Sequence, residues 1–171
     1  MKPVISITRA AELVRSGQTL ALGGFTLYRR PVAFVRALLA TDVRDLTLLC
    51  FTASYESDLL VGAGRVGAVR TCYFGFEAFG LAPMFTQEAS AGRLRVIEET
   101  EASLAFGLRA TLAGVGFMPG QGWLGTDMLR ARPDVKTITC PYTGQQVVAF
   151  PAITCDVAVI HAPMADRAGN A

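Results

Sequence analysis

Residues 22–34 read LGGFTLYRRPVAF, where an apolar run stops at two glycines and a proline follows a short polar stretch. A glycine pair lets the backbone turn sharply and approach a ligand with no Cβ in the way. Pro31 suits the first position of a helix, where its missing N–H costs nothing. We therefore expect a strand, a tight loop and a helix N-terminus, an arrangement that open α/β proteins use to hold anionic or carbonyl groups.

The rest of the chain alternates apolar runs of strand length with helical patterns. We expect strands at residues 18–24, 45–52, 68–75 and 94–99. We expect helices at residues 7–17, 31–41, 57–64, 82–92 and 101–114. Such alternation is typical of a parallel sheet with helices packed on it. The sequence therefore predicts the α/β class, with an open, mainly parallel sheet and helices on both faces.

The pattern changes after Gly116. We expect the glycine-rich residues 117–129 to form a loop, and residues 135–153 to form a β-hairpin turned at Tyr-Thr-Gly-Gln. Residues 155–163 predict another buried strand. The polar residues 164–171 provide no helix to cover that strand, so we expect either a C-terminally incomplete chain or a partner on this side.

The composition fits one domain over residues 1–171, and 51% of the residues are hydrophobic, which is enough for a sizeable core. The 16 basic and 14 acidic residues nearly balance, and no run of one sign occurs. We therefore expect small molecules and proteins as partners, with no nucleic-acid and no membrane surface. The high apolar content predicts that the excess apolar surface lies either inside the protein or in a subunit interface.

The first residues carry charges among their apolar positions and lack a signal-peptide cleavage site, which predicts a cytoplasmic protein. Four cysteines, Cys50, Cys72, Cys140 and Cys155, lie far apart and form no CxxC pair. We interpret them as reduced thiols and expect no metal site.

Two further features have both a functional and a structural interpretation. His161, the single histidine, ends a predicted strand, which would bring it to the carboxyl edge where ligands bind in such sheets. It could equally be a neutral imidazole bonded to a nearby loop carbonyl. The string GAGRVG at residues 62–67 has the letters of a dinucleotide fingerprint, but it follows a helix and precedes a strand, so we interpret it as a loop.

Glu98, Glu99 and Glu101 lie where a strand passes into a helix, with Thr100 as the expected N-cap. Acidic residues in a first helical turn are favoured by the helix dipole, so capping can explain them. Alternatively, one carboxylate lies at the carboxyl edge of the sheet, near residues 22–25 if the two strands are neighbours. Glu101 is the candidate for that role.

Residues 17–31, GQTLALGGFTLYRRP, resemble the signature of the A (alpha) subunit of family I coenzyme A transferases, and most closely the glutaconate CoA-transferase branch. Arg29 stands where the general signature has a glycine. Residues 59–69, 117–127 and 136–170 resemble the same subunit in order and spacing, so the resemblance covers nearly the whole chain.

The resemblance implies an activity. Such transferases move CoA between an acyl-CoA thioester and a free carboxylate through a glutamyl-CoA thioester, and the glutamate belongs to a Ser-Glu-Asn-Gly motif of the B subunit. This chain has no such string. The resemblance therefore implies a non-nucleophilic A subunit that needs a B subunit, in an A2B2 hetero-oligomer. Coenzyme A thioester would be its substrate, with no cofactor bound covalently in this chain, and alpha subunits of the family are typically longer.

The resemblance also implies substrate-binding residues: Gly23, Gly24, Phe25, Arg29, Arg30 and Gln121. The Gly-Gly-Phe backbone would bring N–H groups to the acyl part of the thioester. Either arginine would pair with a substrate carboxylate, which a guanidinium can bind in two places, unless the two form only a solvent-facing basic pair. The glutamine belongs to the matching segment at residues 117–127.

One departure implies different chemistry. Family transferases often carry Gln-Gly-Thr-Leu where this chain has TEASL, so Glu101 replaces the glutamine. The alpha subunit of the ring-opening hydrolases of steroid degradation, which this chain also resembles, places a working glutamate in that region. Glu101 would then be the general base that activates water to cleave a carbon–carbon bond in a cyclic CoA thioester. A third alternative is a truncated scaffold that is inactive alone.

Overall fold

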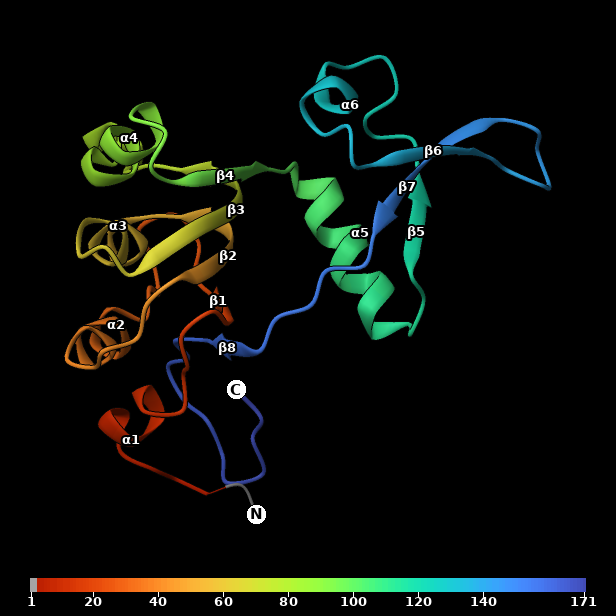
Figure 1. Cartoon of the computed structure of the whole chain (residues 1–171). Helices are drawn as coiled ribbons and strands as arrows, with labels where there is room; N and C mark the ends of the chain where they lie inside the picture. Colours follow the sequence, from red (N-terminus) through yellow and green to blue (C-terminus); the bar gives the residue numbers. More distant parts are fainter. Residues whose placement is uncertain (1–2) are drawn as a thin grey trace. The chain divides into compact units, whose positions relative to one another are not determined.

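A five-stranded sheet with the strand order β4-β3-β2-β1-β8 organises the first part of the structure (Figure 1). The computed structural model describes residues 3–171. The strands are β1 (Thr19–Leu22), β2 (Leu46–Ala53), β3 (Val66–Phe74), β4 (Arg95–Glu98) and β8 (Val157–Val159). β1 pairs in parallel with both β2 and β8, and β2 pairs in parallel with β3. The predicted α/β class with a mainly parallel sheet is confirmed.

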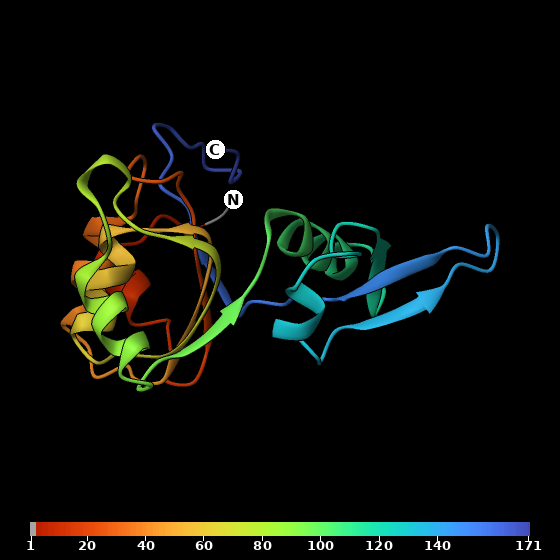
Figure 2. The same ribbon diagram turned by 90° about the horizontal axis from the view of Figure 1, so that it is seen from above.

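Four helices accompany this sheet: α1 (Ile7–Ala11), α2 (Val32–Leu39), α3 (Tyr55–Gly62) and α4 (Pro83–Ser90). They lie in one layer on one face of the sheet, each against the next (Figure 2). The sequence predicts helices on both faces, and the other face of this sheet carries none of the four. The reason is topological, because β1 to β4 follow one another in one direction across the sheet. Right-handed crossovers taken in a single direction place α2, α3 and α4 on the same face, and α1, which precedes β1, packs beside α2.

Apolar side chains from the strands and helices fill the space between the two layers. Leu20 of β1, Leu48 of β2, Val35 of α2 and Leu60 of α3 are all 0% exposed. Fully burying a side chain of this size contributes about 1.5–3 kcal/mol. On α2 the buried residues Phe34, Val35 and Leu38 form the face that packs on the sheet.

Side chains satisfy the ends of two of these helices. The Ser6 hydroxyl caps α1, which ends at Ala11 although the pattern predicts a helix as far as residue 17. Asp58 of α3 accepts a hydrogen bond from the Phe85 amide at the start of α4 (2.7 Å). Burial raises the pKa of Asp58, while the amide hydrogen bonds oppose that shift. The α3–α4 contact thus depends on a carboxylate that reaches from one helix to the N-terminus of the next.

A second sheet, antiparallel in the order β5-β7-β6, is built from Glu98–Thr154. Its elements are α5 (Glu101–Leu112), β5 (Phe117–Gly120), α6 (Met128–Ala131), β6 (Lys136–Thr139) and β7 (Gln146–Pro151). β6 and β7 form the predicted hairpin. The segment predicted as a loop, residues 117–129, instead begins with β5. Pro119 is tolerated there because β5 is an edge strand, where a missing N–H need not cost a ladder hydrogen bond.

The second sheet has its own small core around Trp123. Trp123 and Phe150 are each 1% exposed, and their rings meet edge to face at a centroid distance of 5.2 Å. The indole N–H donates a hydrogen bond to the Thr100 hydroxyl (2.9 Å), so the polar end of the buried ring has a partner. This core fixes the segment before α5 to the loop after β5.

The described residues group into two compact units. Unit 1 comprises residues 3–97 and 155–171, and unit 2 comprises Glu98–Thr154. A single domain over residues 1–171 stays a prediction. Within residues 3–171, no helix has the length and apolar character needed to cross a membrane.

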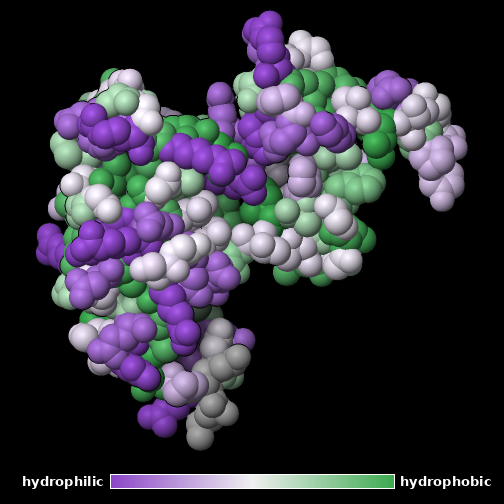
Figure 3. Space-filling model, in the orientation of Figure 1, coloured by the Kyte–Doolittle hydropathy of each residue, from purple (hydrophilic) through white to green (hydrophobic). Residues whose placement is uncertain are grey.

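Apolar side chains are exposed on unit 2, around α5 and β5 (Figure 3). Leu112 at the end of α5 is 87% exposed, and Val115 and Phe117 are 46% and 42% exposed. Exposed apolar residues grouped in this way are typical of surfaces that contact another protein. A subunit interface is one of the two places expected for the excess apolar surface.

Candidate functional site

The carboxyl ends of β1 and β8 form the point of this sheet at which the strand order reverses. β1 leads through α2 to β2 on one side, while β8 lies on the other side of β1. Ligands of open α/β sheets bind in the crevice outside such a reversal. The Gly23 amide donates a hydrogen bond to the Val159 carbonyl (2.9 Å), and a Cβ on Gly23 would lie 3.2 Å from that same oxygen. Glycine therefore lets the two strand ends meet.

The loop of residues 23–30 then folds back on itself in a strained conformation. The Phe25 and Tyr28 backbones exchange hydrogen bonds of 3.0 and 2.8 Å. Thr26 and Arg29 hold positive φ angles of 47° and 52°, which β-branched and long side chains rarely adopt. Phe25 is 67% exposed, so the predicted substrate-binding Gly-Gly-Phe segment reaches the surface.

Gly24 has no room for a side chain in this loop. Its φ is 117°, and a Cβ there would lie 2.7 Å from Arg30 Cδ and 2.9 Å from the carbonyl oxygens of Tyr28 and Arg29. We expect Gly24→Ala to lower the free energy of unfolding of unit 1 by about 1–3 kcal/mol, because strain and steric overlap combine. Urea denaturation followed by circular dichroism measures this. Gly64→Ala is the matched control, because Gly64 also has a positive φ (67°) but no atom within 4 Å of its Cβ position.

The two adjacent arginines have opposite environments. Arg29 is exposed, and its side chain has no hydrogen-bond or ion-pair partner among residues 3–171. Arg30 is 6% exposed and forms an ion pair with Glu56 of α3, which is 0% exposed. The Arg30 guanidinium also donates to the Thr52 carbonyl at the end of β2 (2.8 Å). Arg30 is thus engaged inside unit 1, whereas the Arg29 side chain is exposed, and the substrate-binding role of each stays a prediction.

Glu56 has a polar neighbour on its own helix. Ser57 donates a hydrogen bond to the Glu56 carboxylate (2.8 Å) and lies 3.6 Å from the Cys50 sulfur. Burial raises the pKa of the Cys50 thiol to about 11, so this thiol is protonated and unreactive at neutral pH. Glu56 is not among the residues predicted from the sequence. Residues 55–62 read YESDLLVG and gave no sign of its burial, because an acidic residue in a first helical turn is ordinarily explained by the helix dipole.

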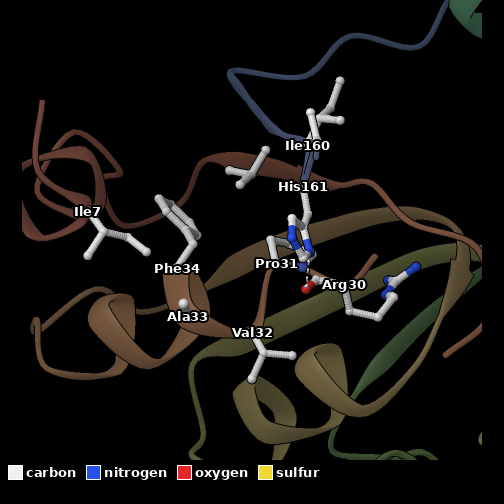
Figure 4. Close-up of a pocket in the computed structure, with 10 residues that line it drawn as sticks. Ile7, Arg30, Pro31, Val32, Ala33, Phe34, Ile160 and His161 are labelled. Carbon is white, nitrogen blue, oxygen red and sulfur yellow. Dashed lines mark hydrogen bonds between the residues drawn. The ribbon is translucent and has the colours of Figure 1, made fainter. Parts of the chain in front are cut away.

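A cavity of about 430 Å³ lies beside the start of α2 and the end of β8 (Figure 4). Its wall is mostly apolar, with Ile7, Phe34 and Ile160 among the lining residues. His161 also lines it, and its Nδ1 lies 3.3 Å from the Arg30 carbonyl oxygen. A carbonyl oxygen can only accept, so this contact is a hydrogen bond when Nδ1 carries a proton. This contact agrees with the structural interpretation of His161 in one respect, the bond of its ring to a loop carbonyl.

The three predicted carboxylates of unit 2 have separate roles. Thr100 caps α5, as expected, and forms a capping box with Ser103. Glu101 is the first residue of α5 and is exposed, with no side-chain hydrogen bond or ion pair in the described chain. Glu99 is 6% exposed and forms an ion pair with Arg132 (2.7 Å). Glu98 is exposed at the end of β4.

A carboxylate after β4 was expected near residues 22–25 only if β4 and β1 were neighbours, and they are not. β4, which leads to Glu101, is separated from β1 by β3 and β2. The sequence leaves open whether the two strands are neighbours, because a strand order is fixed by long-range pairing. Gln121, in unit 2, is exposed and donates a hydrogen bond to the Gln145 side chain (3.2 Å). Its predicted role in substrate binding stays a prediction.

No group of three or more His, Cys, Asp or Glu side chains suited to a metal occurs among residues 3–171. The four cysteines are all thiols, with Cys50 buried and Cys155 exposed. The candidate site in unit 1 comprises the backbone amides of residues 23–25, the exposed Arg29, the buried Arg30–Glu56 ion pair and His161.

The model of the coenzyme A transferase family matches residues 4–171. This chain belongs to that family. The chain is 36% identical over 177 residues to the cholesterol ring-cleaving hydrolase IpdA subunit of Rhodococcus jostii, covering 98% of this chain and 58% of the relative. It is 33% identical over 174 residues to the A subunit of the 3-oxoadipate CoA-transferase of Pseudomonas knackmussii, covering 99% of this chain and 61% of the relative.

Solved structures agree with this family membership. The glutaconate coenzyme A-transferase of Acidaminococcus fermentans matches with a TM-score of 0.87 and 31% identity, over 96% of this chain and 58% of that one. A variant of the decarboxylase AibA/AibB matches with a TM-score of 0.88 and 29% identity, over 95% of this chain and 63% of that one. The predicted resemblance to the A subunits of family I coenzyme A transferases is confirmed. The chain spans about three fifths of the length of these relatives.

Proposed function

We propose that this chain acts as the non-nucleophilic A subunit of a heteromeric CoA-transferase, which moves CoA between an acyl-CoA thioester and a free carboxylate. The nucleophilic glutamate would belong to a B subunit, because this chain has no Ser-Glu-Asn-Gly string. The observation that carries the proposal is the strained loop of residues 23–30 at the reversal of strand order, which exposes Arg29 without an internal partner. The names of the glutaconate and 3-oxoadipate relatives, both of which denote dicarboxylates, support a carboxylate-bearing substrate.

The loop limits which backbone groups can take part. The Gly23 amide bonds Val159, and the Phe25 amide bonds Tyr28. The Gly24 amide has no acceptor among the described residues, so it is the N–H of the Gly-Gly-Phe segment that can reach a thioester carbonyl. An amide at this position would stabilise the negative charge that develops on that oxygen during acyl transfer. In this proposal Gly24 and Arg29 contact the substrate, while Gly23 and Arg30 build the loop.

The proposed CoA transfer requires a B subunit as partner. With the glutamate on a B subunit, this chain alone would bind substrate weakly and transfer no CoA, which is also the behaviour of a truncated, inactive scaffold. The names of the 3-oxoadipate and glutaconate relatives support a two-subunit enzyme, and we propose an A2B2 assembly with CoA thioesters as substrates and no covalent cofactor in this chain.

Co-expression with the B subunit, followed by incubation with acyl-CoA, should yield a glutamyl thioester on the partner that hydroxylamine or borohydride traps. A trapped adduct on this chain instead of its partner would contradict the proposal.

A second function is favoured by one specific observation. This chain is 36% identical to a relative named as a ring-cleaving hydrolase subunit, and Glu101 is an exposed carboxylate at the first position of α5. An unpaired, solvent-accessible carboxylate can accept a proton from water. The chain would then be the A subunit of a hydrolase that opens a cyclic acyl-CoA, without any glutamyl-CoA intermediate.

Glu101→Gln separates the two functions. For the transferase we expect the assembled enzyme to keep at least about a tenth of kcat, because the covalent glutamate lies on the other subunit. For the hydrolase the same change removes the base, and the loss should be about 100 to 10,000-fold. Both reactions are measured on the wild-type and variant assemblies. Glu98→Gln is the matched control, an exposed carboxylate nearby whose loss should change neither rate more than about twofold.

A further inference from the structure

Glu56 is a fully buried carboxylate that the proposed chemistry does not use. It lies in the first turn of α3 with 0% of its side chain exposed, and it pairs with Arg30, whose side chain is 3% exposed. Two polar atoms of the pair, Arg30 Nε and Glu56 Oε2, have no hydrogen-bond partner in the described chain. The pair is therefore deeply desolvated and incompletely satisfied.

Such a pair is a poor source of stability. Moving two charges out of water costs more than an imperfect geometry returns, and apolar side chains of similar volume often replace a buried ion pair without loss. The incomplete hydrogen bonding of this pair makes its net contribution still smaller. A role in fixing geometry explains the pair better than a role in holding unit 1 together.

The geometry that the pair fixes is that of the loop of residues 23–30. Arg30 donates to the Thr52 carbonyl (2.8 Å), and the Thr52 hydroxyl accepts from the Thr26 amide (3.0 Å). Both ends of the turn are therefore tied to one residue at the carboxyl end of β2. The Arg30 carbonyl also accepts from His161 after β8 (3.3 Å), and the Arg30 Cδ packs against Gly24.

We propose that Glu56 is a positioning residue, which acts through Arg30 to hold the loop in the conformation that presents the Gly24 amide and the Arg29 side chain. Thr26 and Arg29 have left-handed backbone conformations that persist only where the surroundings enforce them. Arg30, held at one end by Glu56 and at the other by its backbone bond to His161, supplies that enforcement. The change in enzyme kinetics that we expect on losing Glu56 rests on the proposed function, whereas the expected loss of order in the loop does not.

The test is Glu56→Gln in the full chain, assembled with its B subunit. We expect amide hydrogen exchange of residues 23–30, measured by mass spectrometry, to become at least about tenfold faster, while β2 and β3 keep their protection. We expect kcat/KM to fall by about 10 to 100-fold, with most of the change in KM for the carboxylate. Glu88→Gln is the matched control, because Glu88 pairs with Arg93 on the surface of unit 1, where the arginine side chain is 58% exposed. It should change exchange and kinetics less than about twofold.

A second variant covers the case in which Glu56→Gln does not fold. Arg30→Met with Glu56→Met removes both charges together and should restore the fold, yet the loop should still exchange at least about tenfold faster, because no guanidinium reaches Thr52. Loop exchange within about twofold of the wild type, in whichever variant folds, would overturn the positioning role. Faster loop exchange in an assembly whose wild type transfers no CoA would keep the positioning role and reject the proposed function instead.

Discussion

Arg132→Ala is expected to lower the free energy of unfolding of unit 2 by about 3–5 kcal/mol, the cost of leaving a buried charge without its partner. Arg132 pairs with Glu99, and their side chains are only 8% and 3% exposed. It also donates to the Glu98 carbonyl (2.9 Å) and to Asp134 (2.8 and 2.9 Å). The carboxylates of Asp134 and Glu99 raise the pKa of Arg132 above its ordinary value, against the effect of burial.

Trp123 makes this measurement specific to unit 2. It is the single tryptophan of the chain, and its ring centre lies 5.9 Å from the Arg132 guanidinium carbon. Urea denaturation followed by tryptophan fluorescence therefore reports the unfolding around this ion pair. Arg130→Ala is the matched control, because Arg130 and its partner Asp127 have side chains 80% and 84% exposed and should contribute less than about 0.5 kcal/mol. A loss below about 1 kcal/mol for Arg132→Ala would show that water reaches Glu99 and compensates its charge.

Arg29→Ala is expected to raise KM for a dicarboxylate by about 10 to 1000-fold, which corresponds to about 1.4–4.1 kcal/mol of binding free energy. The guanidinium can form a bidentate, charge-assisted pair with the distal carboxylate, and alanine cannot. Alanine keeps the Cβ at a φ of 52°, so the backbone strain of the loop is unchanged and the loss reports the side chain. A monocarboxylate should barely be affected, because it has no second carboxylate to lose.

Steady-state kinetics of the assembled enzyme with matched mono- and dicarboxylate acceptors measure this difference. Arg36→Ala provides the control, because Arg36 is an exposed arginine on α2 that lies outside the loop. We expect it to change KM by less than about twofold for both acceptors. Equal increases for the two acceptors in Arg29→Ala would show that Arg29 supports the structure of the loop and does not bind the substrate.

Features that depend on neighbouring residues can be predicted from the sequence. The glycine pair at Gly23 and Gly24 predicts a sharp turn because only a residue without Cβ fits there, and a Cβ on Gly24 would indeed overlap the loop backbone. Thr100 predicts the start of α5 because a hydroxyl at that position satisfies a free amide of the first turn, and this cap is present. The parallel sheet and the hairpin likewise follow from periodicity and turn residues, both of which are local.

Tertiary structure alone decided the features that join distant parts of the chain. The sequence treats Arg29 and Arg30 alike, and only the fold buries one of them against Glu56, 26 positions away. Glu99 likewise looks like a helix-dipole residue until its partner Arg132, 33 positions away, is brought beside it. The strand order, with β4 separated from β1, depends on the same kind of long-range pairing. Local patterns report which face of an element is apolar, but charge pairing in the interior is set by which elements pack together, and that information is spread over the whole chain.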